Sequence, residues 1–382
     1  MSQQRIHWPY IIAAYLALFS FGFLDNVRGP FFPNILKDMN LTDGQGSWFF
    51  AIASFIAFFG SYLAPWVLRL VGSLSGLRLG LLAIIVGFFS MSFAGGLTGL
   101  LVASACFGMG LGLLQVFQHT CIQDGANRFM QRRLFNGLHS MYALSALFAP
   151  VVTAGLFAVN WTWRESFQLF CVLPLLALIY SFFVRTVRSE HTNNHHVKAS
   201  RSELIHIIYV ATIVALYVTA ELSISTRLVL YVQRVLTVSD TFSTMYLTLF
   251  FLLLFAGRLT FVFFDFKNWR NQKIIVMALG LSLVFYVAVL TINPWFLSVC
   301  GFTMAPVFAV SMDWIGDLFG EKASLGISLA LAIGSLFIVS MHNLVGYLSD
   351  VYGIRLALAV GPCFLLVSLV LAALHSKFFS SI

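Results

Sequence analysis

The sequence predicts an all-α membrane protein with twelve transmembrane helices in two six-helix bundles. Three observations predict this class. Of the 382 residues 60% are hydrophobic, only 9% are charged, and uncharged apolar runs long enough to cross a bilayer recur along the whole chain. A soluble protein would not repeat runs of about twenty uncharged residues so many times. The composition therefore excludes an ordinary soluble enzyme or binding domain.

Charged residues, glycines and prolines divide the apolar sequence into twelve expected spans. They lie near residues 9–35, 47–68, 76–95, 97–122, 135–158, 165–184, 206–232, 242–264, 273–292, 295–317, 323–347 and 354–375. The first span is too long for a signal peptide, contains Asp25 and lacks a small-residue cleavage site. We expect it to remain in the mature protein.

Lysine and arginine cluster in alternate loops, which predicts the orientation of the spans. The loops that are rich in lysine and arginine carry Arg5, Arg69, Arg78, Arg128, Arg132, Arg133, Arg185, Arg188, Lys198, Arg201, Lys267, Arg270, Lys273, Lys322 and Lys377. The opposite loops carry only Lys37, Arg164, Arg234 and Arg355. We therefore expect a multi-pass protein of a bacterial inner (plasma) membrane with both termini in the cytoplasm. The net charge of +8 is spread over these short loops without a binding motif, which argues against nucleic acid as a partner.

A polar stretch at 185–205, with His191, His195 and His196, is the one linker-like region and divides the spans six and six. We expect an N-terminal bundle at 1–184, a cytoplasmic linker at 185–205 and a C-terminal bundle at 206–382, with a substrate site between the bundles near the bilayer midplane. The five cysteines fall in apolar spans without paired spacing, so we expect packing roles, no metal and no cofactor. There is also no ATP-binding loop.

Two carboxylates, Asp25 and Glu221, lie deep inside expected spans, each with an arginine farther along, Arg28 and Arg227. A charge at bilayer depth is costly unless it is paired or faces a water-filled cavity, so such residues mark a transport pathway by default. Each carboxylate lies roughly 22 Å into the first span of its half at helical rise. The pattern predicts a carrier with Asp25 and Glu221 as proton-coupling groups.

Asp25 and Arg28 are three residues apart, on one helical face, where they can pair or bind a dipolar ligand together. Pro30 follows and removes a helical hydrogen bond, so we expect a helix break whose carbonyls near Asn26 turn toward a ligand. The alternative is a permanent ion pair that only holds the bundle together.

Glu221 and Arg227 are six residues apart and lie on different faces, so we expect each to find its partner on another span. Glu221 is either a proton or substrate site or a structural contact between bundles. Arg227 is either a substrate ligand or a gate residue nearer the outer mouth.

Polar side chains of the fourth and fifth spans supply the rest of an expected pocket. These are Gln115, Gln118, His119, His139 and Tyr142. Amide, imidazole and phenol groups recognise hydroxyls or a polar headgroup. The alternative for each is a hydrogen bond between helices, which is common in membranes.

Several segments resemble the major facilitator superfamily and, within it, the fucose–proton symporter family that includes glucose/galactose carriers. The first span, Gly22–Pro33, resembles that family's first helix, where an Asp precedes a proline. Tyr217–Ser223 resembles its tyrosine-to-glutamate stretch. Shorter likenesses are 136–150, 163–167, Gly257 with Arg258, 305–308 and 346–353. The resemblance implies two six-helix bundles, alternating access and a sugar-like solute.

The chain departs from these patterns at two places. In the segment 60–69 between spans two and three, Ala64 or Pro65 stands where the superfamily signature has an Asp. In the fourth span Gln115 stands where some proton-coupled sugar members place a glutamate, and a glutamine carries no exchangeable proton.

The sequence thus predicts a secondary transporter that moves a small polar, sugar-like solute by alternating access with protons as coupling ion. One alternative is a carrier or exporter of an anionic or amphipathic solute without proton coupling, in which Arg28 and Arg227 bind an acidic group. The other is a polytopic membrane enzyme that uses His119 or His139, although no nucleophile motif is present.

Overall fold

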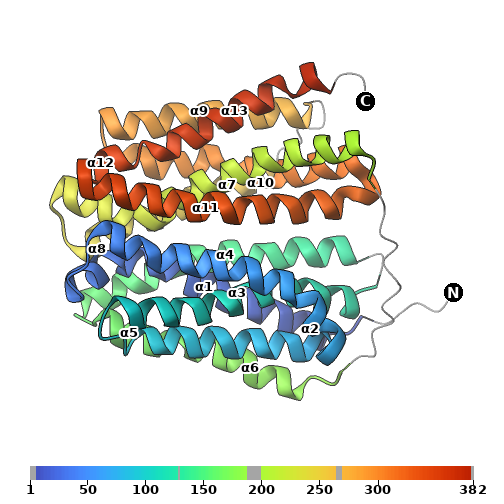
Figure 1. The fold of residues 1–382 in the computed structure, drawn as a ribbon, viewed down its shortest axis with the longest axis horizontal. Helices are drawn as coiled ribbons and strands as arrows, with labels where there is room; N and C mark the ends of the chain where they lie inside the picture. The colour runs from blue at the N-terminus through green and yellow to red at the C-terminus, as the bar shows by residue number, and fades with distance from the viewer. Residues whose placement is uncertain (1–5, 128–129, 187–198, 264–268, 380–382) are drawn as a thin grey trace. The chain divides into compact units, whose positions relative to one another are not determined.

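The computed structural model describes residues 6–127, 130–186, 199–263 and 269–379, which are helical almost throughout (Figure 1). They form two compact units, Met1–Asn193 and Asn194–Ile382. The first unit contains α1 (Trp8–Asp38), α2 (Asp43–Met91), α3 (Leu97–Gly125), α4 (Gln131–Ala158), α5 (Trp163–Phe170) and α6 (Val172–Phe183). The second contains α7 (Arg201–Leu236), α8 (Asp240–Phe263), α9 (Asn271–Thr291), α10 (Trp295–Phe319), the short 3₁₀ helix η1 (Gly320–Lys322), α11 (Ala323–Tyr352), α12 (Ile354–Ala357) and α13 (Val360–Phe378).

The division between the units falls inside the range expected for the linker. Residues 187–198, with His191, His195 and His196, lie outside the described residues, as do Arg5, Arg128 and Lys267 of the basic loops. Residues 201–205, which we expected in the linker, instead form the start of α7. The cause is local: the Ser200 hydroxyl accepts a hydrogen bond from the Glu203 backbone N–H, and the Glu203 carboxylate accepts one from the Ser200 backbone N–H.

Among the described residues, eleven helices or helix pairs are long and apolar enough to cross a membrane. One of them, α2, has 49 residues, about 74 Å at helical rise, which is more than twice the roughly 30 Å that the hydrocarbon core requires. Gly72 inside it has φ 78° and ψ 174°, a conformation that glycine alone adopts readily and no α-helix contains. The chain therefore crosses the membrane twice within α2.

Packing against α3 shows that the chain reverses at Gly72. Before it, Ala53 contacts Gly108 and Ala57 contacts Gly112, so residue numbers rise together and the two stretches run in the same direction. After it, Gly76 contacts Phe117 while Gly87 contacts Phe107, so the direction is opposite. The halves of α2, residues 43–71 and 73–91, are thus antiparallel, and the described residues contain the twelve expected spans, six in each unit. Residues 60–69 form the end of the first half and not a loop, so the turn between spans two and three reduces to Gly72.

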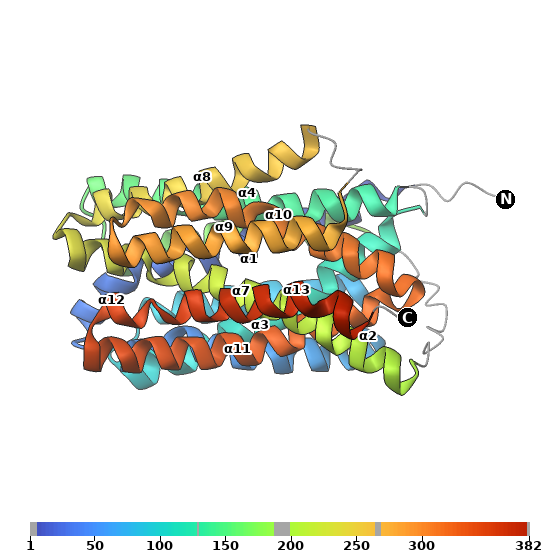
Figure 2. The ribbon, with the colours of Figure 1, turned by 90° about the horizontal axis from the view of Figure 1, so that it is seen from above.

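Helices α1 and α7 are the most buried of the candidate spans. In the first unit α1 packs on α3 and α4, and in the second α7 packs on α8, α10, α11 and α13. Figure 2 shows the helices of each unit running alongside one another. The two central helices carry Asp25 and Glu221, so each expected carboxylate lies on the most enclosed helix of its own unit.

Glycines set the distance between α2 and α3. A Cβ added at Gly112 would lie 2.1 Å from the Ala57 carbonyl oxygen, and one at Gly108 would lie 2.3 Å from the Ala53 carbonyl oxygen. Both obstacles are backbone atoms that a side-chain rotation cannot move. Small residues of this kind let membrane helices approach closely.

We expect Gly112→Ala to destabilise the protein by roughly 1–3 kcal/mol, the usual cost of overpacking a close contact. Thermal unfolding of the purified protein measures the change. Gly155→Ala on α4 is the matched control, because a Cβ there meets nothing within 4 Å and alanine is the better helix former. Equal unfolding temperatures for the two variants would contradict the close-contact explanation.

Candidate functional site

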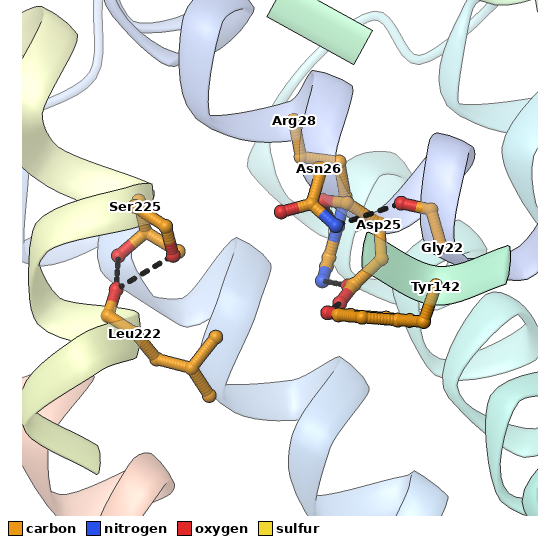
Figure 3. Close-up of polar contacts among 8 residues, drawn as sticks. Gly22, Asp25, Asn26, Arg28, Tyr142, Leu222 and Ser225 are labelled. Carbon is orange, nitrogen blue, oxygen red and sulfur yellow. Dashed lines mark hydrogen bonds and ion pairs between the residues drawn. The ribbon is translucent and has the colours of Figure 1, made fainter. Parts of the chain in front are cut away.

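Asp25 and Arg28 form an ion pair on α1, one turn apart (Figure 3). The Nη2 group of Arg28 donates to Oδ1 of Asp25, and its Nε group lies 3.4 Å from the Asp25 carbonyl oxygen. The two side chains differ in exposure, at 6% for Arg28 and 19% for Asp25. The carboxylate is therefore the accessible member of the pair, and the guanidinium is its buried counter-ion.

Three phenylalanines enclose the Arg28 guanidinium. Its central carbon lies 5.4 Å from the ring centroid of Phe49, 5.1 Å from that of Phe50 and 5.0 Å from that of Phe107. Ring faces attract a cation, and the attraction is strongest where water is excluded. The Nη1 atom is buried and has no hydrogen-bond partner among the described residues. The guanidinium is thus engaged by aromatic rings as well as by Asp25.

The close contact between α2 and α3 places these rings. Phe49 lies one helical turn before Ala53, and Phe107 directly precedes Gly108, the residue that touches the Ala53 carbonyl. Because Cβ is absent at Gly108, the two helices approach until both rings reach the guanidinium. The sequence alone does not reveal this aromatic enclosure, because a Phe-rich chain gives no sign of which rings share a face.

Tyr142 on α4 faces Asp25, as Figure 3 shows. Its hydroxyl lies 3.4 Å from Oδ2 of Asp25, the long end of the hydrogen-bond range. Gly22 makes this approach possible, because a Cβ there would lie 2.2 Å from Ser145 Oγ and 2.9 Å from Tyr142 Cδ2. The structure thus brings together two of the predicted site residues, Asp25 and Tyr142, from different helices.

The helix break expected at Pro30 is absent, since α1 continues through Pro30 to Asp38. Packing on α3 and α4 holds the helix in spite of the lost backbone hydrogen bond. The Asn26 side chain does not reach out toward a ligand. Its Nδ2 group donates to the Gly22 carbonyl 2.8 Å away, and the residue is buried.

The polar residues of α3 and α4 form a second group in the first unit. Ser61 donates to Oε1 of Gln115 over 3.3 Å, which ties α2 to α3. The His119 ring approaches the Gln115 carbonyl to 2.6 Å through Nδ1 and lies with its centroid 5.3 Å from that of His139. Gln118 is 2% exposed, and its Oε1 atom has no hydrogen-bond partner among the described residues. Gln115 is thus already engaged in a contact between helices, the alternative that the sequence left open for it.

In the second unit Glu221 lies against Tyr217, one turn earlier on α7, with 2.5 Å between Oε2 of Glu221 and the Tyr217 hydroxyl oxygen. We expected its partner on another span, and that expectation was wrong, because a tyrosine four residues away already shares its helical face. The contact to another helix runs through Tyr217, whose hydroxyl lies 2.9 Å from the Met304 carbonyl oxygen on α10.

Arg227 is 1% exposed and is among the largest fully buried side chains of the described residues. Whether Arg227 is a substrate ligand or a gate residue stays a prediction. Close to it in sequence, Ser225 donates a hydrogen bond to the Leu222 carbonyl of the same helix (Figure 3). Thr226 donates to the same carbonyl.

Arg258 on α8 was not among the predicted site residues. It is half-buried and lies within electrostatic range of Tyr217. The signal was present in the sequence, because an arginine inside an apolar span invites the same functional interpretation as Asp25. For Tyr217 the sequence offered its spacing from Glu221 and the resemblance of Tyr217–Ser223 to the family's tyrosine-to-glutamate stretch.

A comparison with protein families matches residues 14–330 to the family described as Major Facilitator Superfamily. The chain belongs to this superfamily. The match covers well over half of the sequence and agrees with the two six-helix units. Membership identifies an integral, multi-pass membrane protein that transports small-molecule solutes, and it argues against the membrane-enzyme alternative.

Solved structures with the same fold include several transporters of the superfamily. A D-xylose–proton symporter aligns with a TM-score of 0.78 at 13% identity, covering 97% of each chain. A bacterial homolog of the human lysosomal transporter Spinster, in an inward-facing and occupied conformation, aligns with a TM-score of 0.77 at 13% identity and covers 98% of each chain. A peptide transporter in complex with sulfate gives a TM-score of 0.75 at 14% identity, covering 97% of this chain and 94% of its own. At these identities the likeness shows the fold alone. The comparison with curated proteins gave no match.

We expect the Asp25–Arg28 pair to behave as a buried pair in a double-mutant cycle. Arg28→Met should cost about 3–5 kcal/mol of stability, because Asp25 loses its counter-ion. Asp25→Asn combined with Arg28→Met should recover part of that loss, because neither charge remains.

Thermal unfolding of the four proteins measures this coupling. Lys322→Met is the control, since the Lys322–Glu203 pair is more exposed, at 21% and 39% for the two side chains, and should contribute under about 1 kcal/mol. Additive effects of the two substitutions would show that the charges do not depend on each other.

Proposed function

We propose that the chain is a secondary active transporter that moves a small polar, sugar-like solute by alternating access and couples this movement to protons at Asp25. The observation that supports the proposal is the ion pair on α1, whose two side chains differ in exposure. The carboxylate is partly accessible, whereas its arginine is fixed among three phenylalanine rings. A proton can therefore reach Asp25 without any movement of Arg28.

This geometry also gives Tyr142 a role. A phenol donates to a carboxylate and accepts from a carboxylic acid, so it remains a partner of Asp25 in both protonation states. Arg28 stabilises only the ionised state. Protonation of Asp25 then removes the counter-charge of the guanidinium and leaves it with the aromatic rings and the Asp25 backbone carbonyl, which changes the forces between α1, α2 and α3. Such a dependence of helix contacts on protonation is what coupling requires.

Resemblance supports the finer part of the proposal. The segments Gly22–Pro33 and Tyr217–Ser223 resemble the fucose–proton symporter and glucose/galactose carrier family, and a D-xylose–proton symporter has the same fold. Candidate ligands for hydroxyl groups are Gln118, whose buried side-chain oxygen has no partner among the described residues, and the adjacent His119 and His139. Glu221 and Arg227 are the corresponding candidates of the second unit.

The main alternative is a carrier of an anionic or amphipathic solute without proton coupling. It would use Arg28 as an anion ligand, and the enclosure of Arg28 by Phe49, Phe50 and Phe107 argues against that use. A solute that reached this guanidinium would also have to compete with Asp25.

Asp25→Asn should abolish accumulation of solute driven by an imposed pH gradient while solute-for-solute exchange persists. Asparagine keeps the size and an acceptor for Arg28 but exchanges no proton, and exchange requires no change of protonation. Both activities are measured in the same proteoliposomes, with a solute chosen from a thermal-shift screen of sugars, organic acids and lipids.

Asp38→Asn is the matched control for this experiment, because Asp38 lies on the same helix but in an exposed pair with Arg164. It should retain gradient-driven accumulation. If Asp25→Asn accumulates solute at the parent rate, Asp25 is not the coupling group. If it loses both activities while folded, Asp25 binds the solute directly.

The proposed topology, with both termini in the cytoplasm of a bacterium, is tested by fusions to alkaline phosphatase, which is active only outside the cytoplasm. A fusion at Ile382 should be inactive. A fusion after Asn293, in the short connection between α9 and α10, should be active because this loop carries no lysine or arginine. Reversed activities would show the opposite orientation.

A further inference from the structure

The Tyr217 hydroxyl has one hydrogen atom but lies against two oxygen atoms. It is 2.5 Å from Oε2 of Glu221 and 2.9 Å from the carbonyl oxygen of Met304. A backbone carbonyl only accepts hydrogen bonds. One hydrogen cannot form a full, linear bond to both oxygens, so both bonds are complete in one arrangement: Tyr217 donates to Met304, and a protonated Glu221 donates to the Tyr217 oxygen.

We propose that Tyr217 transmits the protonation state of Glu221 from α7 to α10. When Glu221 is protonated, Tyr217 bonds to Met304 and joins the two helices. When Glu221 releases its proton to water, the Tyr217 hydrogen turns to the carboxylate, because a bond to a charged acceptor is the stronger one. The Met304 carbonyl then loses its bond from α7. Tyr217 keeps its own proton throughout.

Helix α10 lacks a backbone hydrogen bond close to the Met304 carbonyl that accepts the bond from Tyr217. Pro306, two residues after Met304, has no N–H group, so the Phe302 carbonyl lacks its helical hydrogen bond. On the side of α8 the backbones touch directly. A Cβ added at Gly257 would lie 2.7 Å from the Phe302 carbonyl oxygen, and one at Gly301 would lie 2.3 Å from the Phe250 carbonyl oxygen. Near Pro306, α10 is thus held against α8 by close backbone packing at Gly257 and Gly301, and it is joined to α7 by the Tyr217 hydrogen bond.

The surroundings of Tyr217 and Glu221 differ in charge and in exposure. Arg258, next to Gly257 on α8, is a cation within electrostatic range of Tyr217. Tyr217 is fully buried, whereas Glu221 is only half-buried. Glu221 is therefore in a more accessible position than the tyrosine, from which it can exchange a proton with water.

The inference rests on the proposed proton coupling and assigns Glu221 as a second proton site, with Tyr217 as a positioning residue. Infrared difference spectra between low and high pH test it in the full chain, reconstituted in lipid nanodiscs without any solute. The protein carries ¹³C at the carbonyl carbon of its 11 methionines. We expect one labelled carbonyl to change frequency in step with the loss of a carboxylic-acid band.

Three variants assign these signals. Met304→Leu removes the label from that carbonyl and should remove its change. Glu221→Gln keeps both hydrogen bonds, because its amide donates to Tyr217, and should abolish the acid band and the carbonyl change together. Tyr217→Phe should retain the acid band and abolish only the carbonyl change.

A Met304 signal that still changes with pH in Glu221→Gln would overturn the inference, and so would a Glu221 band that titrates while the Met304 signal stays constant. Because Glu221→Gln preserves the bonds of the protonated state, the test does not depend on whether Tyr217→Phe folds. These spectra require no transport. A parent protein that fails to accumulate solute would contradict the proposed function and leave the relay between Glu221 and Met304 intact.

Discussion

The ion pair between Arg28 and Asp25 is the interaction on which the first unit depends. A guanidinium inside an apolar bundle is tolerated only where a counter-charge and polarisable surroundings replace water. Asp25 supplies the counter-charge from the same helix, and three phenylalanine rings supply the surroundings from α2 and α3. Those rings reach Arg28 because glycines let α2 and α3 approach. The environment of the Arg28 charge therefore depends on the rings, and the position of the rings depends on the glycines.

The two units treat their central carboxylates differently. Asp25 is balanced by a full positive charge on its own helix, with Tyr142 at a longer distance. Glu221 has a neutral tyrosine as its close partner, and the arginine recorded within range of that tyrosine is on the neighbouring helix α8. A carboxylate beside a neutral donor has much less to hold its charge than one in an ion pair. Equivalent positions on α1 and α7 therefore carry different electrostatic environments.

Composition and charge spacing were sufficient to predict the fold class. Apolar runs of bilayer length and the alternation of basic loops predicted twelve spans, and the sequence also indicated that Asp25 and Arg28 share a face. The sequence could not show which aromatic rings surround the Arg28 guanidinium, because 40 phenylalanines leave too many possible neighbours.

Two further expectations failed for reasons that lie in tertiary packing. Pro30 predicted a helix break, but contacts along α1 keep the helix continuous. Glu221 was expected to pair across spans, but Tyr217 on its own helix lies closer. Local rules describe what a residue favours in isolation, and here the neighbouring helices decided the outcome.

The reversal at Gly72 bears on how the chain enters the bilayer. Only one residue between 43 and 91 departs from helical geometry, so the two halves of α2 are joined by almost no loop that must lose conformational freedom. Such a segment can insert as a ready-made helical hairpin, with both crossings established in a single event. Its backbone is hydrogen-bonded within each half from the start, which is the condition that hydrocarbon imposes on any inserted chain. The α3 helix, arriving next in sequence, would then meet a two-helix surface whose glycines are already in register to receive it.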